Sequence, residues 1–183
     1  MYFFNGVIFK KTRKKESAGF TLIEVLVASF VIVVGVIASY IVVQQIFAQT
    51  FDASTRLTAI YLAKEGAEIV RNIRDTAWIQ DLPWNTNGIG ANNTYWEGEY
   101  LYTSNLTSCP GSCTFDNLRF LRIRSSMNPP FYNYSQGDNT RFKRRIKIER
   151  PTADSIKLTV DVMWQDNGIK KVTIQSLLYD WKQ

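Results

Sequence analysis

The sequence has no histidine and only two cysteines among its 183 residues. The absence of histidine excludes acid–base catalysis by histidine, serine–histidine and cysteine–histidine nucleophile pairs, and nearly all zinc and haem sites. Two cysteines are too few for a disulfide-rich scaffold or for a metal site made of four thiolates. We therefore expect a protein that is not an enzyme and that holds no metal and no cofactor.

Excess charge of either sign is nearly absent from most of the chain. The net charge is +6, and residues 1–19 account for +4 of it, with five basic side chains against one acidic. A basic segment directly before an apolar run orients a membrane helix with its N-terminus in the cytoplasm. The charge distribution therefore favours a membrane helix over nucleic-acid binding.

Residues 20–43 form an apolar run, FTLIEVLVASFVIVVGVIASYIVV, which lacks proline and has Glu24 as its only charge. At 1.5 Å per residue this run makes a helix of about 36 Å, enough to cross the hydrocarbon core of a bilayer. It is too long for a secretory signal peptide, and no small-residue cleavage site closes it. We expect the run to stay attached to residues 44–183, which would then be exported.

The segment that enters the membrane reads KKTRKKESAG followed directly by FTLIEVLVAS. It resembles the prepilin signal shared by type IV pilins, competence pseudopilins and type II secretion pseudopilins, with a short basic leader, Gly19, the aromatic Phe20 and an apolar run that contains Glu24. The resemblance implies that a membrane-embedded prepilin peptidase cuts after Gly19 on the cytoplasmic side and that Phe20 is then N-methylated. It also implies that Glu24 pairs with the N-terminal amine of a neighbouring subunit during assembly.

Physical chemistry makes Glu24 a functional candidate as well, because a carboxylate in an apolar helix is unfavourable. A buried amine and a buried carboxylate are each unfavourable alone and offset each other when paired. The alternative for a single charge near a helix end is that Glu24 reaches back to the lipid headgroups or to the lysines. Many major pilins have a helix-loosening proline further along the membrane helix, whereas this run has Gly35 and no proline.

The helix is expected to continue through residues 44–76, which contain no proline. Apolar residues recur there every three or four positions and predict an amphipathic face that packs on the protein's own globular domain. The stripe comprises Ala53, Leu57, Ile60, Ala63, Ala67 and Val70, broadened by Ile69 and Ile73. Pro83 and the residues rich in asparagine and glycine that follow it mark a loop.

From residue 95 onward the apolar pattern has period two, which predicts strands. Two of these runs flank residues 165–168, where Asn167 and Gly168 are a strong hairpin signal. The predicted strands are 95–102, 118–123, 142–150, 155–164 and 169–181. The fold class is therefore α+β, with one long N-terminal helix packed on a small antiparallel β-sheet, a layout that also resembles pilin-like proteins.

Four segments follow from this interpretation. Residues 1–19 are the cleaved basic leader, and residues 20–47 are the transmembrane and assembly helix. Residues 48–80 are the amphipathic continuation of the helix, and residues 81–183 are the extracytoplasmic β-sheet domain.

Cys109 and Cys113 close a short loop, CPGSC. We favour a structural disulfide outside the cytoplasm, with free thiols as the alternative. A redox site would prefer a CxxC spacing. A metal site needs more ligands than the sequence offers nearby.

The strongest basic patch after the leader lies in residues 141–150, RFKRRIKIER. Lys143, Arg144 and Arg145 are candidates for a nonspecific contact with nucleic acid. The ordinary interpretation is the solvated outer face of a half-buried strand, or an edge strand protected by charge. This second interpretation is the one we favour.

The sequence thus predicts a type IV pilin-like filament subunit, a minor pilin or pseudopilin. Its partners would be other pilin subunits, the prepilin peptidase and methyltransferase, the pilus assembly platform and the membrane. It would be a single-pass membrane precursor first and part of a cell-surface filament or pseudopilus afterwards. The alternatives are a pseudopilin of a DNA-uptake or type II secretion machine that contacts DNA, and a plain membrane-anchored extracellular domain.

Overall fold

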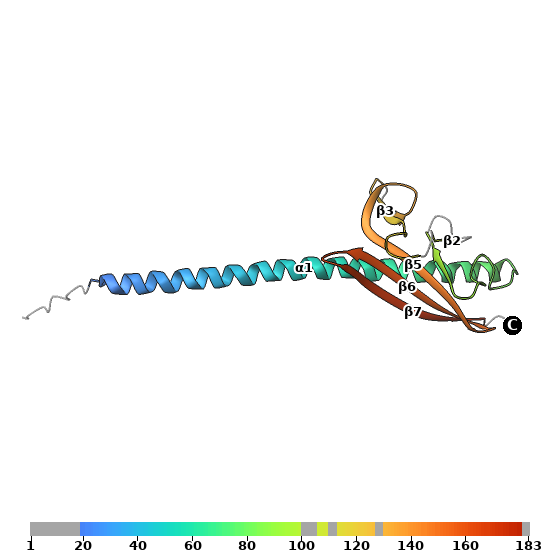
Figure 1. Cartoon of the computed structure of the whole chain (residues 1–183), viewed down its shortest axis with the longest axis horizontal. Helices are drawn as coiled ribbons and strands as arrows, with labels where there is room; N and C mark the ends of the chain where they lie inside the picture. Colours follow the sequence, from blue (N-terminus) through green and yellow to red (C-terminus); the bar gives the residue numbers. More distant parts are fainter. Residues whose placement is uncertain (1–18, 100–105, 110–112, 127–129, 181–183) are drawn as a thin grey trace, which may run out of the picture. The chain divides into compact units, whose positions relative to one another are not determined.

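The computed structural model describes residues 19–99, 106–109, 113–126 and 130–180, which contain one long helix and seven strands (Figure 1). The chain divides into two compact units, residues 1–49 and 50–183. The helix α1, Leu22–Ile79, begins in the first unit and ends in the second. All strands belong to the second unit.

The end of α1 is set by a local backbone motif rather than by a proline inside the helix. Asp81 adopts a left-handed conformation with φ of 52°. The N–H of Leu82 donates to the carbonyl of Ala77 at 2.9 Å, and the N–H of Asp81 donates to that of Trp78 at 3.3 Å. This pair of bonds is the Schellman arrangement, which satisfies carbonyls that the last helical turn leaves free. Pro83 follows and directs the chain into a loop.

The strands form a single antiparallel sheet whose centre is a meander of β5, β6 and β7. The other edge of β5 is shared, because β3 pairs with its first residues and β1 with residues nearer its end. The short strand β4 lies outside β3, and β2 lies outside β1. The bounds are β1 Thr94–Glu97, β2 Thr107–Ser108, β3 Phe120–Arg124, β4 Phe131–Asn133, β5 Asp138–Thr152, β6 Ser155–Gln165 and β7 Ile169–Tyr179.

One face of this sheet packs on the second half of α1, and the main hydrophobic core lies between them (Figure 1). Small residues at Ala59, Ala63 and Ala67 let the helix approach the strands closely. Gly66 is the tightest point, since a Cβ there would lie 2.9 Å from Cγ1 of Val160. The buried strand residues facing α1 alternate in sequence, as in Ile156, Leu158, Val160, Val162 and Trp164 of β6.

The predicted α+β fold, a long helix on an antiparallel sheet, is confirmed. The second part of the predicted amphipathic stripe is buried as expected, at Ala63, Ala67, Ile69, Val70 and Ile73. Its first part is not, since Leu57 is 52% exposed, and Ala59 and Leu62 are buried instead. Strand β5 is longer than predicted, and β2 and β4 were not predicted. The predicted strand 95–102 is seen as Thr94–Glu97, and its last residues lie outside the described part of the chain.

Candidate functional site

The N-terminal end of α1 exposes the predicted processing site. Residues 1–18 of the predicted leader lie outside the described residues. Gly19 and Phe20 precede the helix, and both are exposed. A Cβ added at Gly19 would meet no atom within 4 Å. The peptide bond between Gly19 and Phe20 is therefore accessible in a non-helical backbone.

Thr21 caps the first turn of α1. Its side-chain oxygen accepts a hydrogen bond at 3.3 Å from the backbone N–H of Glu24. Thr21 and Glu24 have the spacing of a capping box, which explains why the helix begins here. Among the described residues no hydrogen bond or ion pair engages the carboxylate of Glu24. The carboxylate is exposed in the first turn, where the positive end of the helix dipole favours a negative charge.

The first half of α1 is an apolar surface that no described residue covers. It contains an 18-residue window with a mean hydropathy of 2.8, none of which is buried. By length and composition this helix can cross a membrane. We call this surface the apolar helix face, residues 22–47. Its large exposed side chains are Leu22, Ile23, Val25, Leu26, Val27, Phe30, Val31, Ile32, Val33, Val34, Val36, Ile37, Tyr40, Ile41, Val42, Val43, Ile46 and Phe47.

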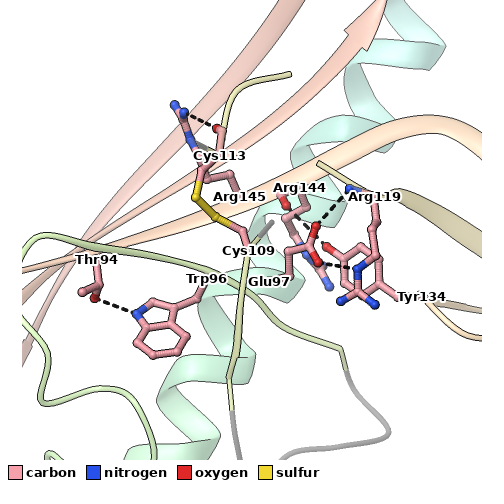
Figure 2. The surroundings of a disulfide bond; sticks show 9 residues. All are labelled: Thr94, Trp96, Glu97, Cys109, Cys113, Arg119, Tyr134, Arg144 and Arg145. Atoms are coloured by element: carbon pink, nitrogen blue, oxygen red, sulfur yellow. Dashed lines mark hydrogen bonds and ion pairs between the residues drawn. A yellow bond between two sulfur atoms is a disulfide. The ribbon is translucent and has the colours of Figure 1, made fainter. Parts of the chain in front are cut away.

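Cys109 and Cys113 are joined by a disulfide, with Cα atoms 5.8 Å apart (Figure 2). Both cysteines are buried, and they pack with Leu118 and Met163 in a second, smaller core. Met163 comes from β6 but points to the sheet face opposite α1. The two cysteines and Leu118 therefore cover part of the outer face of the sheet, which was predicted from the sequence to be solvated.

Two cations of β5 on that outer face are held by Cys113 and the residues that follow it. The ammonium of Lys143 donates to the carbonyl of Phe115 at 2.8 Å and lies over the rings of Phe115 and Phe120. Nη1 of Arg145 donates to the carbonyl of Cys113 at 2.9 Å, as Figure 2 shows. Nη2 of Arg145 pairs with Asp161 at 2.6 Å. These two cations are structural ties between the loop and the sheet.

Arg144 points the other way, into the interface between the sheet and α1, and is fully buried. Its Nη1 donates to the carbonyl of Leu62 on α1 at 2.9 Å, and its Nη2 donates to the carbonyl of Gly98 at 2.6 Å. The carboxylate of Glu65, which is 30% exposed, lies 3.4 Å from Nη1. One guanidinium thus links the helix, the central strand and the segment after β1.

Glu97, Arg119 and Tyr134 form a further group of polar side chains near Arg144 (Figure 2). Glu97 accepts hydrogen bonds from the backbone N–H and from Nε of Arg119, at 3.0 and 2.6 Å. The guanidinium of Arg119 stacks over the ring of Tyr134 with 4.8 Å between its carbon and the ring centroid. Burial raises the pKa of Tyr134 to about 12, and the nearby carboxylate of Glu97 acts in the same direction. Tyr134 therefore stays neutral at physiological pH.

The predicted nucleic-acid contact does not fit this geometry. Arg144 is buried against α1, and Lys143 is buried with its ammonium bound to the carbonyl of Phe115. Arg145 is neutralised by Asp161. The prediction that this strand presents its cations to solvent is wrong for Lys143, which is buried, whereas Arg141 is exposed and Lys147 is partly exposed.

The described residues contain no group of three or more potential metal ligands among histidine, cysteine, aspartate and glutamate. Sequence reasoning missed two structural residues, Glu97 and Arg144. A single glutamate inside a predicted strand, as at Glu97, carries no local signal that it will be buried. Arg144 did carry a local signal, because it occupies an even-numbered position of the strand. Phe142, Ile146 and Ile148 occupy the same set of alternate positions, and all of them face the core.

One comparison with known proteins gives a match. Residues 14–40 match the model of the prokaryotic N-terminal methylation motif. No curated protein and no solved structure is significantly similar to the chain. The match spans the end of the leader, Gly19, Phe20, Glu24 and the first part of α1.

Replacing Cys109 and Cys113 together by serine should lower the free energy of unfolding by about 2 kcal/mol, the value that loop-closure entropy gives for so short a loop. Denaturant unfolding of the full chain in detergent micelles, followed by tryptophan fluorescence, measures the change. Reductant should produce the same shift in the wild type and none in the double variant. An unfolding midpoint that neither treatment moves would show that the loop does not depend on the disulfide.

Replacing Arg144 by leucine should destabilise the domain by about 3 kcal/mol, because the carbonyls of Leu62 and Gly98 lose their donors and Glu65 loses its counter-charge. The matched control is Arg141→Leu, which removes an exposed arginine from the same strand and should change stability by less than about 0.5 kcal/mol. Thermal unfolding of both variants gives the comparison. Equal effects at the two positions would contradict the role assigned to Arg144.

Proposed function

We propose that this chain, which carries the N-terminal methylation motif of type IV pilin-like proteins, is a filament subunit of the minor pilin or pseudopilin kind. The match of residues 14–40 to that motif is the observation on which the proposal rests. It confirms the resemblance to the type IV pilin-like family at the processing signal. The α+β architecture, a long N-terminal helix with an antiparallel sheet, agrees with it.

The apolar helix face explains why such a chain needs both a membrane and an assembly. A fully buried leucine, isoleucine, valine or phenylalanine side chain is favoured by about 1.5–3 kcal/mol over an exposed one. The face offers many such side chains, and none of them is covered by the described residues of its own chain. Lipid would cover them in the precursor, and the helices of neighbouring subunits would cover them in a filament. A filament requires an interface that repeats without closing, and a helix that packs lengthwise on its neighbours supplies one.

Cleavage after Gly19 is the step that changes the chain from precursor to subunit. Before cleavage the basic leader holds the N-terminus in the cytoplasm. Afterwards the leader charge is lost, and Phe20 carries a free amine, then methylated, at the start of α1. The exposed, non-helical backbone at Gly19 and Phe20 supports access by a prepilin peptidase.

Glu24 would then set the position of one subunit against the next. Its carboxylate is about 6 Å along the helix axis from Phe20, four residues at 1.5 Å each. An amine from a neighbouring subunit placed beside it would neutralise both charges inside the apolar assembly. Apolar packing alone leaves the axial register weakly defined, and this single charge pair would define it.

The proposal also distinguishes a minor pilin or pseudopilin from a major pilin. The helix α1 continues from Leu22 to Ile79 with no proline in its apolar part, whereas many major pilins have one there. This supports a minor pilin or pseudopilin. Its partners would be other pilin subunits, the prepilin peptidase and methyltransferase, and the assembly platform in the membrane.

Gly19 provides the first test. A bulky residue such as valine at this position should leave an uncut precursor, with cleavage slowed at least about tenfold, which corresponds to about 1.4 kcal/mol in the barrier. Gly19→Ala is the matched control and should still be cut, since alanine remains small. Electrophoretic mobility of the chain in membranes that contain the peptidase shows both outcomes. Normal cleavage of the Gly19→Val variant would contradict processing at this bond.

Glu24 provides the second test. The Glu24→Val variant should be cleaved normally and yet be depleted from sheared filaments at least about tenfold relative to wild type, equivalent to about 1.4 kcal/mol of lost pairing free energy. Ser29→Val is the control, because it also replaces an exposed polar residue of the same helix by valine. Immunodetection in filament and membrane fractions measures the distribution. Equal incorporation of the Glu24→Val and wild-type chains would rule out the charge-pair mechanism.

A further inference from the structure

Strand β7 is a long and unprotected edge of the sheet. Its eleven residues pair only with β6 among the described strands, in continuous register from Ile169 to Tyr179. The strands at the opposite edge are far shorter, two residues in β2 and three in β4. Native proteins normally protect exposed edges by short strands, bulges, proline or charge. The protein does so at β2 and β4 and does not do so at β7.

The exposed part of β7 has the composition of a strand that pairs readily. From Val172 to Tyr179 it contains no charge, no proline and no glycine. Leu177 and Tyr179 are 53% and 56% exposed on the outer face. The two lysines of the strand, Lys170 and Lys171, lie at its start. An uncharged stretch such as residues 172–179 favours the addition of another strand at its edge.

The backbone groups that are available can be identified. The N–H of Asp180 donates to the carbonyl of Asp154, so Asp180 directs its hydrogen-bonding groups toward β6. Alternate residues of a strand direct these groups to opposite edges, and β7 has no bulge. The odd-numbered residues therefore present N–H and C=O groups at the free edge. They are Lys171, Thr173, Gln175, Leu177 and Tyr179.

We propose that β7 pairs with β7 of a second copy of this chain, antiparallel and centred on Gln175. In this register each odd-numbered residue lies opposite an odd-numbered residue of the other copy, so both strands present hydrogen-bonding groups at the same positions. Gln175 meets Gln175, and Thr173 meets Leu177. A shallow depression lined by Lys157, Gln175, Ser176 and Leu177 lies at this centre.

Charge complementarity favours the register centred on Gln175 and favours a second copy of this chain as the partner. It places Lys170 opposite Asp180 and Lys171 opposite Tyr179, each pair twice because of the two-fold symmetry. Opposite charges and cation–aromatic pairs across strands are favourable. A shift of the centre to Ile174 would place Lys170 and Lys171 opposite Leu178 and Leu177 and lose both pairs. The side chain of Lys170 is 41% exposed, and its ammonium lies 3.1 Å from Asp52 and 2.8 Å from Asp166, so the pairing would bring Asp180 beside an existing cluster of charges.

The symmetry of this pairing determines which subunits it can join. A two-fold axis between antiparallel edge strands is perpendicular to the sheet, so it reverses the direction of the α1 segment 59–78 that packs on the sheet. Subunits within one polar filament all point the same way and cannot pair by this operation. The pairing would therefore join subunits of two different filaments that run in opposite directions. This consequence rests on the proposed function, whereas the pairing itself does not.

Cysteine cross-linking of the purified full chain in detergent micelles tests the pairing directly. The native cysteines are already joined to each other, so an introduced cysteine reports on contacts between copies. Under a mild oxidant Gln175→Cys should form a covalent dimer, because the two Cα atoms would lie about 5.5 Å apart. Thr173→Cys is the matched control on the same face of the same strand, and its Cα atoms would lie about 14 Å apart. A mixture of Thr173→Cys and Leu177→Cys chains should again cross-link.

The proposed register is contradicted if Thr173→Cys alone dimerises as readily as Gln175→Cys, or if neither Gln175→Cys nor the mixed pair dimerises. Filaments give an independent readout. Gln175→Lys places two lysines against each other at the two-fold axis, so it should abolish lateral bundling seen by electron microscopy. Thr107→Lys, an exposed change of equal charge on β2, should leave bundling intact. Both variants should be incorporated into filaments, and loss of incorporation of both would count against the proposed function rather than the pairing.

Discussion

One physical constraint governs this protein: the apolar surface of α1 from residue 22 to residue 47 is not covered by the described part of its own chain. The described part of the chain buries none of this surface, although it is the most apolar stretch of the sequence. Water cannot be its permanent environment, because each large side chain left exposed forfeits about 1.5–3 kcal/mol. Lipid and neighbouring helices are the two environments that can cover it. In the proposed assembly the single carboxylate of Glu24 would make the contact between helices specific, because it would need a positive partner at one depth.

In the second unit, the two faces and the edge of the sheet are covered to different extents. One face of the sheet is covered by α1, and the buried guanidinium of Arg144 ties the two together through the carbonyls of Leu62 and Gly98. The other face is covered partly by the two cysteines, Leu118 and Phe115, and Arg145 and Lys143 bind the carbonyls of Cys113 and Phe115. The edge of β7 is left open. Among the described residues, the edge of β7 is therefore the longest part of the sheet that no strand covers.

The features that could be predicted from sequence are those with a local period or a contiguous motif. The apolar run, the amphipathic helix and the β6–β7 hairpin around Asn167 and Gly168 belong to this class. The hydrogen bonds of Arg144 do not, because its acceptors lie 82 and 46 residues away in the chain. Alternation alone places Arg144 on the core face with Phe142 and Ile146, but it cannot identify these acceptors. Strands β2 and β4 are too short for any period, and their pairing comes from the longer strands beside them.

The central claim is that the chain is processed at Gly19 and assembled through α1. The intact mass of the protein in sheared surface filaments, compared with that in the membrane fraction, tests it most directly. The account predicts that filaments contain a species that begins at Phe20 and carries one added methyl group. A species that begins at Met1 and is found only in the membrane would contradict the account and would favour a plain membrane anchor.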